Sequence, residues 1–192
     1  MKMNIVIFGP PGAGKGTQSK FIVQKYNIHQ LSTGDLLRNE IKNGTDLGNK
    51  ISSIMNAGEL VSDKIVSDLI EKFISNENYK NQIIFDGYPR TLTQAKNLDI
   101  LLKKYQQKID IVLKLNVSLE TIKKRISERK SIEKRADDNE EIAIKRFQTY
   151  EKSSEPVLDY YRQTKLLKVV NGENSISQIN DEISGLIDSI KG

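Results

Sequence analysis

The feature that most constrains this sequence is a glycine-rich loop close to its start. Residues 9–15 (GPPGAGK) follow the apolar run 5–8 (IVIF) and open a segment with helical patterning that extends toward Tyr26. A strand, a glycine-rich loop and a helix in this order form a phosphate-binding loop, in which backbone N–H groups surround the anion and the helix N-terminus adds positive potential. Lys15 is then expected to reach the β and γ phosphates of a nucleoside triphosphate.

The rest of the chain continues the α/β pattern that this loop requires. Apolar runs alternate with helical patterns, which predicts parallel strands joined by crossover helices. The runs are continuously apolar, as expected for strands covered on both faces. The predicted strands are 4–8, 28–31, 82–85, 109–115 and 166–170. With 192 residues, the chain suffices for one domain, and we predict a P-loop α/β fold with a five-stranded parallel sheet flanked by helices.

Two stretches are not expected to extend this sheet. Residues 32–61 predict two short helices punctuated by glycines, and residues 129–135 predict a brief charged connection between two helices. Both would lie at the carboxyl ends of the strands, where open α/β sheets bind ligands. We therefore divide the single domain, 1–192, into a core (1–31, 62–128 and 136–192), a helical insertion (32–61) and a short lid (129–135).

Serines at three expected helix starts are predicted to act as N-caps. Ser32 with Asp35 and Ser175 with Gln178 fit the capping-box pattern, and Ser62 precedes a strongly amphipathic helix. The single histidine is expected to pack within the structure and is assigned no chemistry.

Composition narrows the class of protein. Hydrophobic residues make up 37% and charged residues 29% of the chain, which fits a folded globular protein and excludes a disordered one. No apolar run approaches the length of about 20 residues that spans a membrane. The first residues indicate a strand and not a signal peptide, because they pass directly into the loop without a small-residue cleavage site. We expect a cytoplasmic protein, and a monomer because no long apolar stripe is left over.

The sequence contains no cysteine, which excludes disulfides and thiolate metal sites. The net charge is +5, from 30 Lys and Arg against 25 Asp and Glu, and most of it comes from lysine. Because guanidinium grips two phosphate oxygens at once, each arginine is a candidate phosphate ligand. The arginines are Arg38, Arg90, Arg125, Arg129, Arg135, Arg146 and Arg162.

The loop also carries a family resemblance. Residues 9–18 (GPPGAGKGTQ) resemble the nucleoside monophosphate kinases, and the adenylate kinases in particular. Glycine stands at 16, where phosphate loops usually carry a magnesium-binding hydroxyl, and in this family magnesium is held mainly through the nucleotide phosphates and waters. No direct protein ligand to the metal is therefore expected, and Asp86, at the end of a strand, would order the water on Mg²⁺. The residues implied to bind ATP here are Gly12, Ala13, Gly14, Lys15, Gly16 and Thr17.

Two further segments resemble the AMP site of the same family: residues 31–38 (LSTGDLLR), and residues 86–91 (DGYPRT) with Gln94 behind them. The resemblance implies that Arg38 and Arg90 grip the AMP phosphate. Related uridylate–cytidylate kinases typically carry Ala in place of Thr33 and Asn in place of Thr91, so AMP is favoured as the acceptor. The residues implied to frame the adenosine are Thr33, Glu59, Leu60, Val61, Gly87, Tyr88, Pro89 and Gln94.

The last resemblance lies in the charged region after residue 124. Arg129, then residues 135–141 (RADDNEE), then Arg146 match the family's lid pattern. The resemblance implies that Arg125 covers the ATP adenine near Gly172 and Asn174. Arg129, Arg135 and Arg146 would close on the transferring phosphoryl group, oriented by Asp137 and Asp138. The chain has no room for the β-rich lid of long adenylate kinases and no cysteines for its zinc, so it resembles the short-lid type.

We expect an ATP:AMP phosphotransferase that converts MgATP and AMP reversibly into two ADP. Six of the seven arginines fall on motif positions and leave Arg162 as an ordinary surface residue. Phosphoryl transfer to a phosphate oxygen needs positioning and charge stabilisation and no general base. The residues expected to act in catalysis are Lys15, Asp86, Arg90, Arg129, Arg135 and Arg146.

Three alternatives stay open at this point. A kinase of another nucleoside monophosphate is the nearest. A GTP-dependent switch would need an Asn-Lys-x-Asp run, which the sequence lacks. Nucleic-acid binding is weakly permitted by the charge, but aromatic residues make up only 6% and do not interleave with the basic segments.

Overall fold

Five parallel strands form the sheet of this protein, in the order β2-β3-β1-β4-β5. The computed structural model describes residues 2–133 and 140–190. Each predicted strand is confirmed, and its ends differ from the predicted ones by at most two residues. Neighbouring strands pair in parallel throughout. The strands are β1 (Met3–Phe8), β2 (His29–Ser32), β3 (Gln82–Asp86), β4 (Ile111–Asn116) and β5 (Leu167–Asn171).

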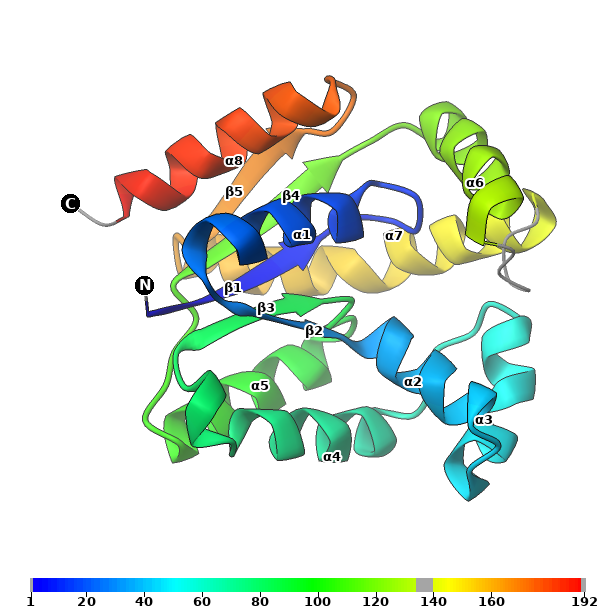
Figure 1. Cartoon of the computed structure of the whole chain (residues 1–192), viewed down its shortest axis with the longest axis horizontal. Helices are drawn as coiled ribbons and strands as arrows, with labels where there is room; N and C mark the ends of the chain where they lie inside the picture. Colours follow the sequence, from blue (N-terminus) through cyan, green and yellow to red (C-terminus); the bar gives the residue numbers. More distant parts are fainter. Residues whose placement is uncertain (1, 134–139, 191–192) are drawn as a thin grey trace.

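Helices cover both faces of the sheet (Figure 1). Helices α1 (Lys15–Tyr26) and α8 (Ile176–Ser189) pack on one face. On the other face lie α4 (Asp63–Ile74), α5 (Leu92–Lys104) and α7 (Glu140–Gln163). Helix α6 (Leu119–Glu133) packs against α7, and a short 3-10 turn, η1 (Glu77–Tyr79), precedes β3. The predicted α/β class with a sheet enclosed on both sides is therefore confirmed.

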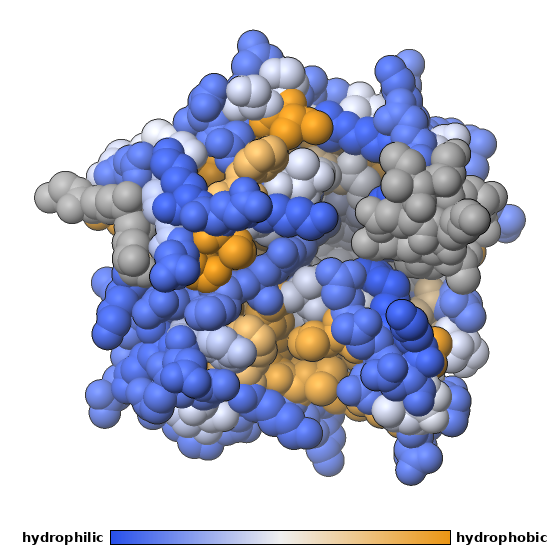
Figure 2. All heavy atoms as spheres, in the orientation of Figure 1, coloured by the Kyte–Doolittle hydropathy of each residue, from blue (hydrophilic) through white to orange (hydrophobic). Residues whose placement is uncertain are grey.

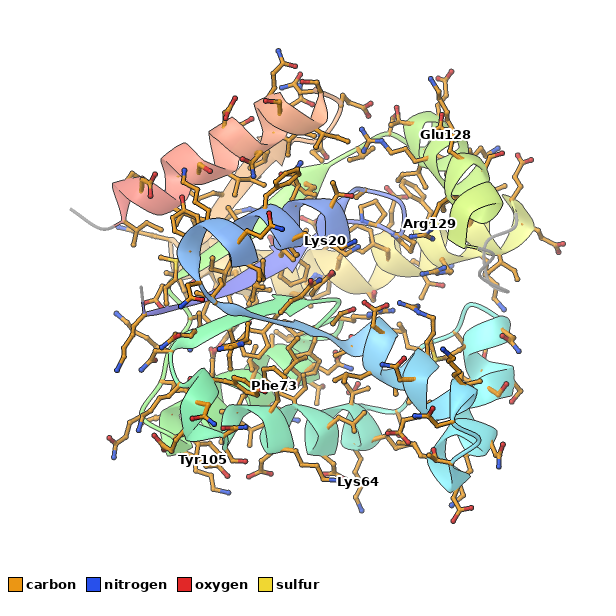
Figure 3. All side chains as sticks on the ribbon, in the orientation of Figure 1. Lys20, Lys64, Phe73, Tyr105, Glu128 and Arg129 are labelled. Atoms are coloured by element: carbon orange, nitrogen blue, oxygen red, sulfur yellow. The ribbon has the colours of Figure 1, made fainter. Side chains whose placement is uncertain are left out.

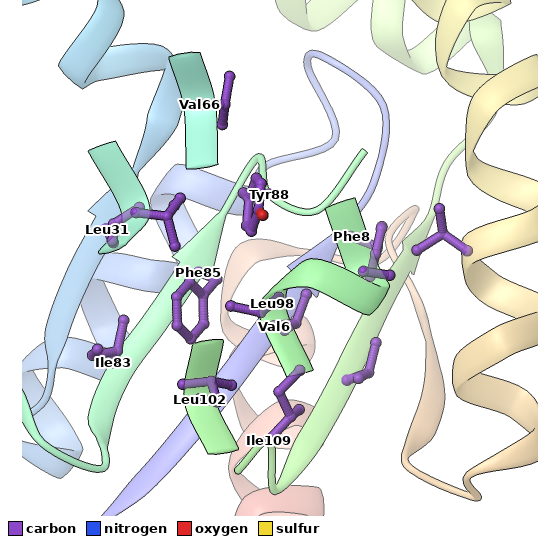
Figure 4. Close-up of a cluster of buried hydrophobic side chains, with 14 of the residues drawn as sticks. Val6, Phe8, Leu31, Val66, Ile83, Phe85, Tyr88, Leu98, Leu102 and Ile109 are labelled. Atoms are coloured by element: carbon purple, nitrogen blue, oxygen red, sulfur yellow. The ribbon is translucent and has the colours of Figure 1, made fainter. Parts of the chain in front are cut away.

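Strand β1 explains why the apolar runs are continuous. Successive side chains of a strand point to opposite faces: Ile5 and Ile7 belong to the core under α1 and α8, whereas Val6 and Phe8 belong to the core under α4, α5 and α7. All four are at most 5% exposed. Figure 4 shows the second of these cores, in which Phe85 from β3 packs beside Leu98 and Leu102 from α5.

The segment after β2 forms the two short helices expected within residues 32–61, α2 (Thr33–Lys42) and α3 (Asp46–Asn56). The two helices lie very close together at Gly48. A Cβ at this position would lie 2.2 Å from the backbone oxygen of Glu40, so only glycine fits there. Residues 129–133 do not form the expected connection, since α6 continues to Glu133. Arg129 is therefore on a helix, and residues 134–139 lie outside the described residues.

Two of the three predicted caps are present. Ser175 and Gln178 form a reciprocal capping box, and the Ser32 hydroxyl accepts the hydrogen bond of the Asp35 backbone N–H. The prediction for Ser62 is wrong: it occupies the N-cap position of α4 but its side chain makes no capping hydrogen bond. The negative charge at this helix N-terminus comes from Asp63, where it is stabilised by the helix dipole.

The face of the molecule in Figure 2 is largely hydrophilic, and its hydrophobic residues gather mainly between α4 and the insertion helices. No helix in the described part of the chain combines the length and the hydropathy needed to cross a membrane. The ring of His29 lies 4.4 Å from that of Tyr79, a packing contact that agrees with the structural role expected for it.

Candidate active site

The glycine-rich loop between β1 and α1 has the backbone shape that a phosphate loop requires. Gly12 and Gly14 adopt positive φ angles of 86° and 94°, which residues with a Cβ rarely tolerate. A Cβ on Gly12 would also lie 3.0 Å from Cγ1 of Ile126 on α6. The turn therefore favours glycine at both positions, and the close approach of α6 adds a second reason at Gly12.

Lys15, the first residue of α1, folds back over the loop. Its Nζ donates to the backbone oxygens of Gly9 at 2.7 Å and Pro10 at 3.1 Å. The pKa of its ammonium is lowered to about 8, mainly by burial; nearby arginines act in the same direction and Asp86 opposes the change. The charged form of Lys15 is therefore energetically unfavourable in this buried position until an anion binds beside it.

Asp86 ends β3 beside the loop and is 8% exposed. Its Oδ2 accepts a hydrogen bond from Nε2 of Gln30 at 3.0 Å. Burial raises the pKa of the Asp86 carboxyl group, while the charge of Lys15 acts in the opposite direction. A Cβ at Gly16 would stand 4.0 Å from the same oxygen, so the glycine leaves space between loop and carboxylate. A hydrated Mg²⁺ fits this arrangement of a carboxylate, open space and a phosphate loop.

No group of three or more metal-ligating side chains occurs in residues 2–133 and 140–190. The loop cavity is lined by three carboxylates, Asp35, Asp86 and Glu128, which do not form such a group. Such a site suits a metal that arrives with a nucleotide and keeps most of its water.

Two arginines approach the site from the insertion and from the segment after β3. Arg38 on α2 pairs with Asp35 one turn earlier on the same helix. Nε of Arg90 donates to the backbone oxygen of Gly87 at 2.7 Å, and the same oxygen accepts from Oγ1 of Thr33 at 2.9 Å. These bonds fix the Arg90 guanidinium near the carboxyl end of β3.

A third group of arginines comes from α6 and α7. Arg125 bridges the loop and the turn after β5, because its two terminal nitrogens donate to the backbone oxygens of Ala13 at 3.2 Å and Gly172 at 2.9 Å. In Figure 3, Arg129 lies between α6 and the loop that precedes α1. Arg146 on α7 lies beside the end of the insertion, where its Cγ is 3.1 Å from the position of a Cβ on Gly58.

Two cavities share several of these basic side chains. One lies over the glycine-rich loop and is lined also by Asp86, Arg125 and Arg129. The other lies between the insertion and the core and has a more apolar lining. Both cavities are lined by Lys15, Arg38, Arg90 and Arg146.

The structure brings nearly all the sequence-predicted site residues to these two cavities. The backbone oxygen of Gly172 accepts a hydrogen bond from Arg125, which lines the loop cavity. Asn174 lies in the same turn and lines neither cavity. Arg135 lies outside the described residues. The loop cavity is lined by Gly12, Ala13, Gly14, Lys15, Gly16, Thr17, Arg125 and Arg129. The apolar cavity is lined by Thr33, Arg38, Glu59, Leu60, Val61, Gly87, Tyr88, Pro89, Arg90, Gln94 and Arg146.

Sequence reasoning missed several lining residues. Helix α7 contributes Thr149, Tyr150, Ser153 and Ser154 to the apolar cavity. Their spacing places them on one face of a helix, a signal that the assignment of this region to the core did not use. Gln30, the hydrogen-bond partner of Asp86, was also missed.

Comparisons with known proteins give one consistent result. A family model described as Adenylate kinase matches residues 7–166. An adenylate kinase of Pelagibacter ubique is 42% identical over 211 residues, covering 96% of this chain and 99% of the relative. An adenylate kinase of Archaeoglobus fulgidus is 37% identical, covering 98% of this chain and all of the relative. One of Bacteroides fragilis is 40% identical over 188 residues, covering 98% of this chain and all of the relative.

Proposed function

The chain belongs to the adenylate kinase family, and on this basis we propose how its two cavities hold ATP and AMP. It is a nucleoside monophosphate kinase, which transfers a phosphoryl group from ATP to AMP and forms two ADP. The observation that carries the residue assignment is the set of four cations shared by both cavities. A phosphoryl group that passes between two nucleotides must lie where their phosphates meet, and these four side chains supply positive charge to both cavities.

ATP occupies the cavity over the loop in this proposal. The backbone N–H groups of the loop and the Lys15 ammonium bind its phosphates. Arg125, held between the loop and Gly172, lies where it can cover the adenine near the turn that contains Asn174. Arg129 lies between α6 and the loop (Figure 3) and binds the transferring phosphoryl group.

AMP occupies the apolar cavity between insertion and core. Arg38 and Arg90 bind its phosphate at the end shared with the loop cavity. Thr33 and Gln94 lie toward the adenine, together with the backbone near Val61 and Gly87. An apolar cavity with a few convergent polar groups is what a purine base requires.

Asp86 would hold the water shell of a Mg²⁺ ion bound together with ATP. When bound, the metal ion neutralises charge on the β and γ phosphates. The buried Asp86 carboxylate is kept in place by Gln30, so that it faces the space next to Gly16 without a direct protein–metal bond. The absence of cysteine from the sequence fits a lid without structural zinc.

Catalysis in this proposal is positioning and charge stabilisation. The AMP phosphate already carries nucleophilic oxygens, so no side chain must remove a proton. The charge on the phosphoryl group during transfer is stabilised by Lys15, Arg90, Arg129 and Arg146. Closure over the two nucleotides excludes water and limits hydrolysis of ATP. Arg135, outside the described residues, is assigned to the same cluster from the sequence alone.

We further propose a short lid and a cytoplasmic monomer. The alignments with the Pelagibacter and Archaeoglobus relatives extend over 211 and 216 residues, so these relatives carry residues without a counterpart among the 192 of this chain. The alignment with the Bacteroides relative needs only 188. A monomer is supported because one chain supplies the lining of both cavities.

The proposal is tested by offering MgATP with AMP, CMP, UMP or GMP to the purified protein and measuring ADP formation in a coupled assay. Turnover that depends on AMP is expected. Turnover with a pyrimidine monophosphate alone would keep the fold and the phosphoryl transfer but overturn the assignment of Thr33, Thr91 and Gln94.

A further inference from the structure

Asp63 lies directly behind the apolar cavity without lining it. It is the first residue of α4 and is half-buried. Its Oδ1 accepts a hydrogen bond from Nε2 of Gln94 at 2.6 Å, and its Oδ2 accepts one from Oγ1 of Thr91 at 3.3 Å. Neither the sequence motifs nor the site described above use this carboxylate.

Gln94 is held at its other end as well. Its Oε1 accepts the backbone N–H of Arg90 at 2.7 Å. The residue is 2% exposed, on α5, and it lines the apolar cavity together with Thr33 and Val61. The amide therefore sits between a carboxylate and a backbone N–H, with its remaining surface toward the cavity.

The chemistry of these two partners permits one orientation of the amide. An ionised carboxylate only accepts hydrogen bonds, and a backbone N–H only donates them. Nε2 must face Asp63, and Oε1 must face the N–H of Arg90. After these two bonds the Gln94 amide still has one N–H hydrogen and one oxygen lone pair for a ligand.

We propose that Asp63 is a specificity-determining positioning residue, which locks the Gln94 amide so that it presents one N–H donor and one oxygen acceptor to the base of the monophosphate. Adenine offers the complementary pair, the N1 acceptor and the 6-amino donor. Hypoxanthine and guanine offer the reverse pair, an N1–H donor and an O6 acceptor. The inference rests on the proposed function, because it takes the apolar cavity as the site of the AMP base.

Asp63 enforces this orientation because turning the Gln94 amide over would raise the energy of the site. To bind a purine with N1–H and O6, Gln94 would have to turn its amide over. Its oxygen would then face the Asp63 carboxylate at the distance of a hydrogen bond, and its NH₂ would face the N–H of Arg90. Two hydrogen bonds would be replaced by two repulsive contacts in a buried site, where unpaired polar groups are most costly.

The replacement Asp63→Asn isolates this effect. Asparagine has the same shape as aspartate, but its side-chain NH₂ can donate to an inverted Gln94 amide. Inosine monophosphate is the sharpest probe, because its base carries N1–H and O6 without the 2-amino group of guanine. The measurement is kcat/KM for AMP and for inosine monophosphate with saturating MgATP, in the wild type and in each variant.

We expect Asp63→Asn to lower the AMP to inosine monophosphate ratio of kcat/KM by at least about tenfold, mainly through KM, since the lost preference is one of base binding. Asp68→Asn is the matched control, because Asp68 is exposed on the same helix, and it should keep the wild-type ratio. The ratio compares two substrates of one protein, so a smaller folded fraction cancels. An Asp63→Asn ratio within about twofold of the wild type would overturn the lock.

Gln94→Met separates failure of the lock from failure of the AMP site. If the ratio stays at the wild-type value in this variant, Gln94 does not contact the base, and both the adenine assignment and the lock are wrong. If Gln94→Met lowers the ratio and Asp63→Asn does not, the adenine assignment stands and the lock alone is wrong. A drop in both supports the proposal.

Discussion

Lys15 is expected to take up a proton when MgATP binds above neutral pH. The pKa of its ammonium is lowered to about 8, mainly by burial; Asp86 opposes the change, and Arg90, Arg146 and Arg129 add to it. In the proposed site, the phosphates of ATP bring negative charge to the same place and favour the protonated form of Lys15. The pKa of Lys15 should therefore rise in the complex, and binding should be linked to protonation.

The size of this effect follows from the pKa. With a pKa of about 8 for the nucleotide-free enzyme, half of the molecules carry a neutral Lys15 at that pH. If the pKa in the complex returns to its ordinary range, binding takes up about 0.5 proton at pH ~8 and about 0.9 at pH ~9. The Kd for MgATP then weakens by about twofold and about tenfold at these pH values, and the second factor corresponds to about 1.4 kcal/mol.

Isothermal titration calorimetry measures this uptake, because the observed enthalpy varies with the ionisation enthalpy of the buffer in proportion to the protons exchanged. Titrations at about pH 7, 8 and 9 should give rising uptake. Lys15→Arg keeps the charge and removes the titration, so the uptake should disappear. The same replacement at Lys64, exposed on α4 (Figure 3), should not change it. Uptake near zero at about pH 9, or uptake that persists in Lys15→Arg, would refute the reasoning.

Three further outcomes are expected. Arg90→Lys should lower kcat by at least about a hundredfold, because an ammonium group cannot replace the two-pronged guanidinium. Arg162→Lys, the matched change at a surface ion pair, should leave kcat unchanged. Steady-state kinetics measures both variants. Gly48→Ala should destabilise the fold by about 3 kcal/mol or more in urea unfolding, since its Cβ would strike backbone of Glu40 at 2.2 Å. Lys15→Met should raise the Tm of the nucleotide-free enzyme below about pH 8, because the charge of the buried Lys15 ammonium opposes folding there. This gain in Tm should shrink as the pH rises toward the ordinary lysine pKa.

Short-range signals were enough to predict the frame of this molecule. The loop at residues 9–15 fixed the order of strand, loop and helix, and the apolar runs located all five strands. Asp86 was found because it follows such a run directly. The arginines were found by their residue type in a lysine-rich chain and by the motifs around them, and those within the described residues other than Arg162 line the two cavities.

What could not be predicted depends on contacts between distant segments. The bond between Asp63 and Gln94 joins residues 31 positions apart, and it exists because the starts of α4 and α5 lie together. No pattern within either segment specifies it. Ser62 illustrates the opposite error: the residue type fits a cap, yet the first turn of α4 carries its own carboxylate at Asp63, and the hydroxyl makes no capping bond.

The shared cations depend on the whole fold in the same way. Lys15 begins α1 and Arg90 follows β3, so both are attached to the sheet. Arg38 is on α2 of the insertion, and Arg146 is on α7. Because the two cavities share all four side chains, a displacement of the insertion or of α7 would change the positive charge at both of the proposed nucleotide sites at once. The motifs identify each cation separately, but the convergence of these side chains on both cavities depends on the whole fold. This convergence is what supports the proposed phosphoryl transfer between two nucleotides at this point of the structure.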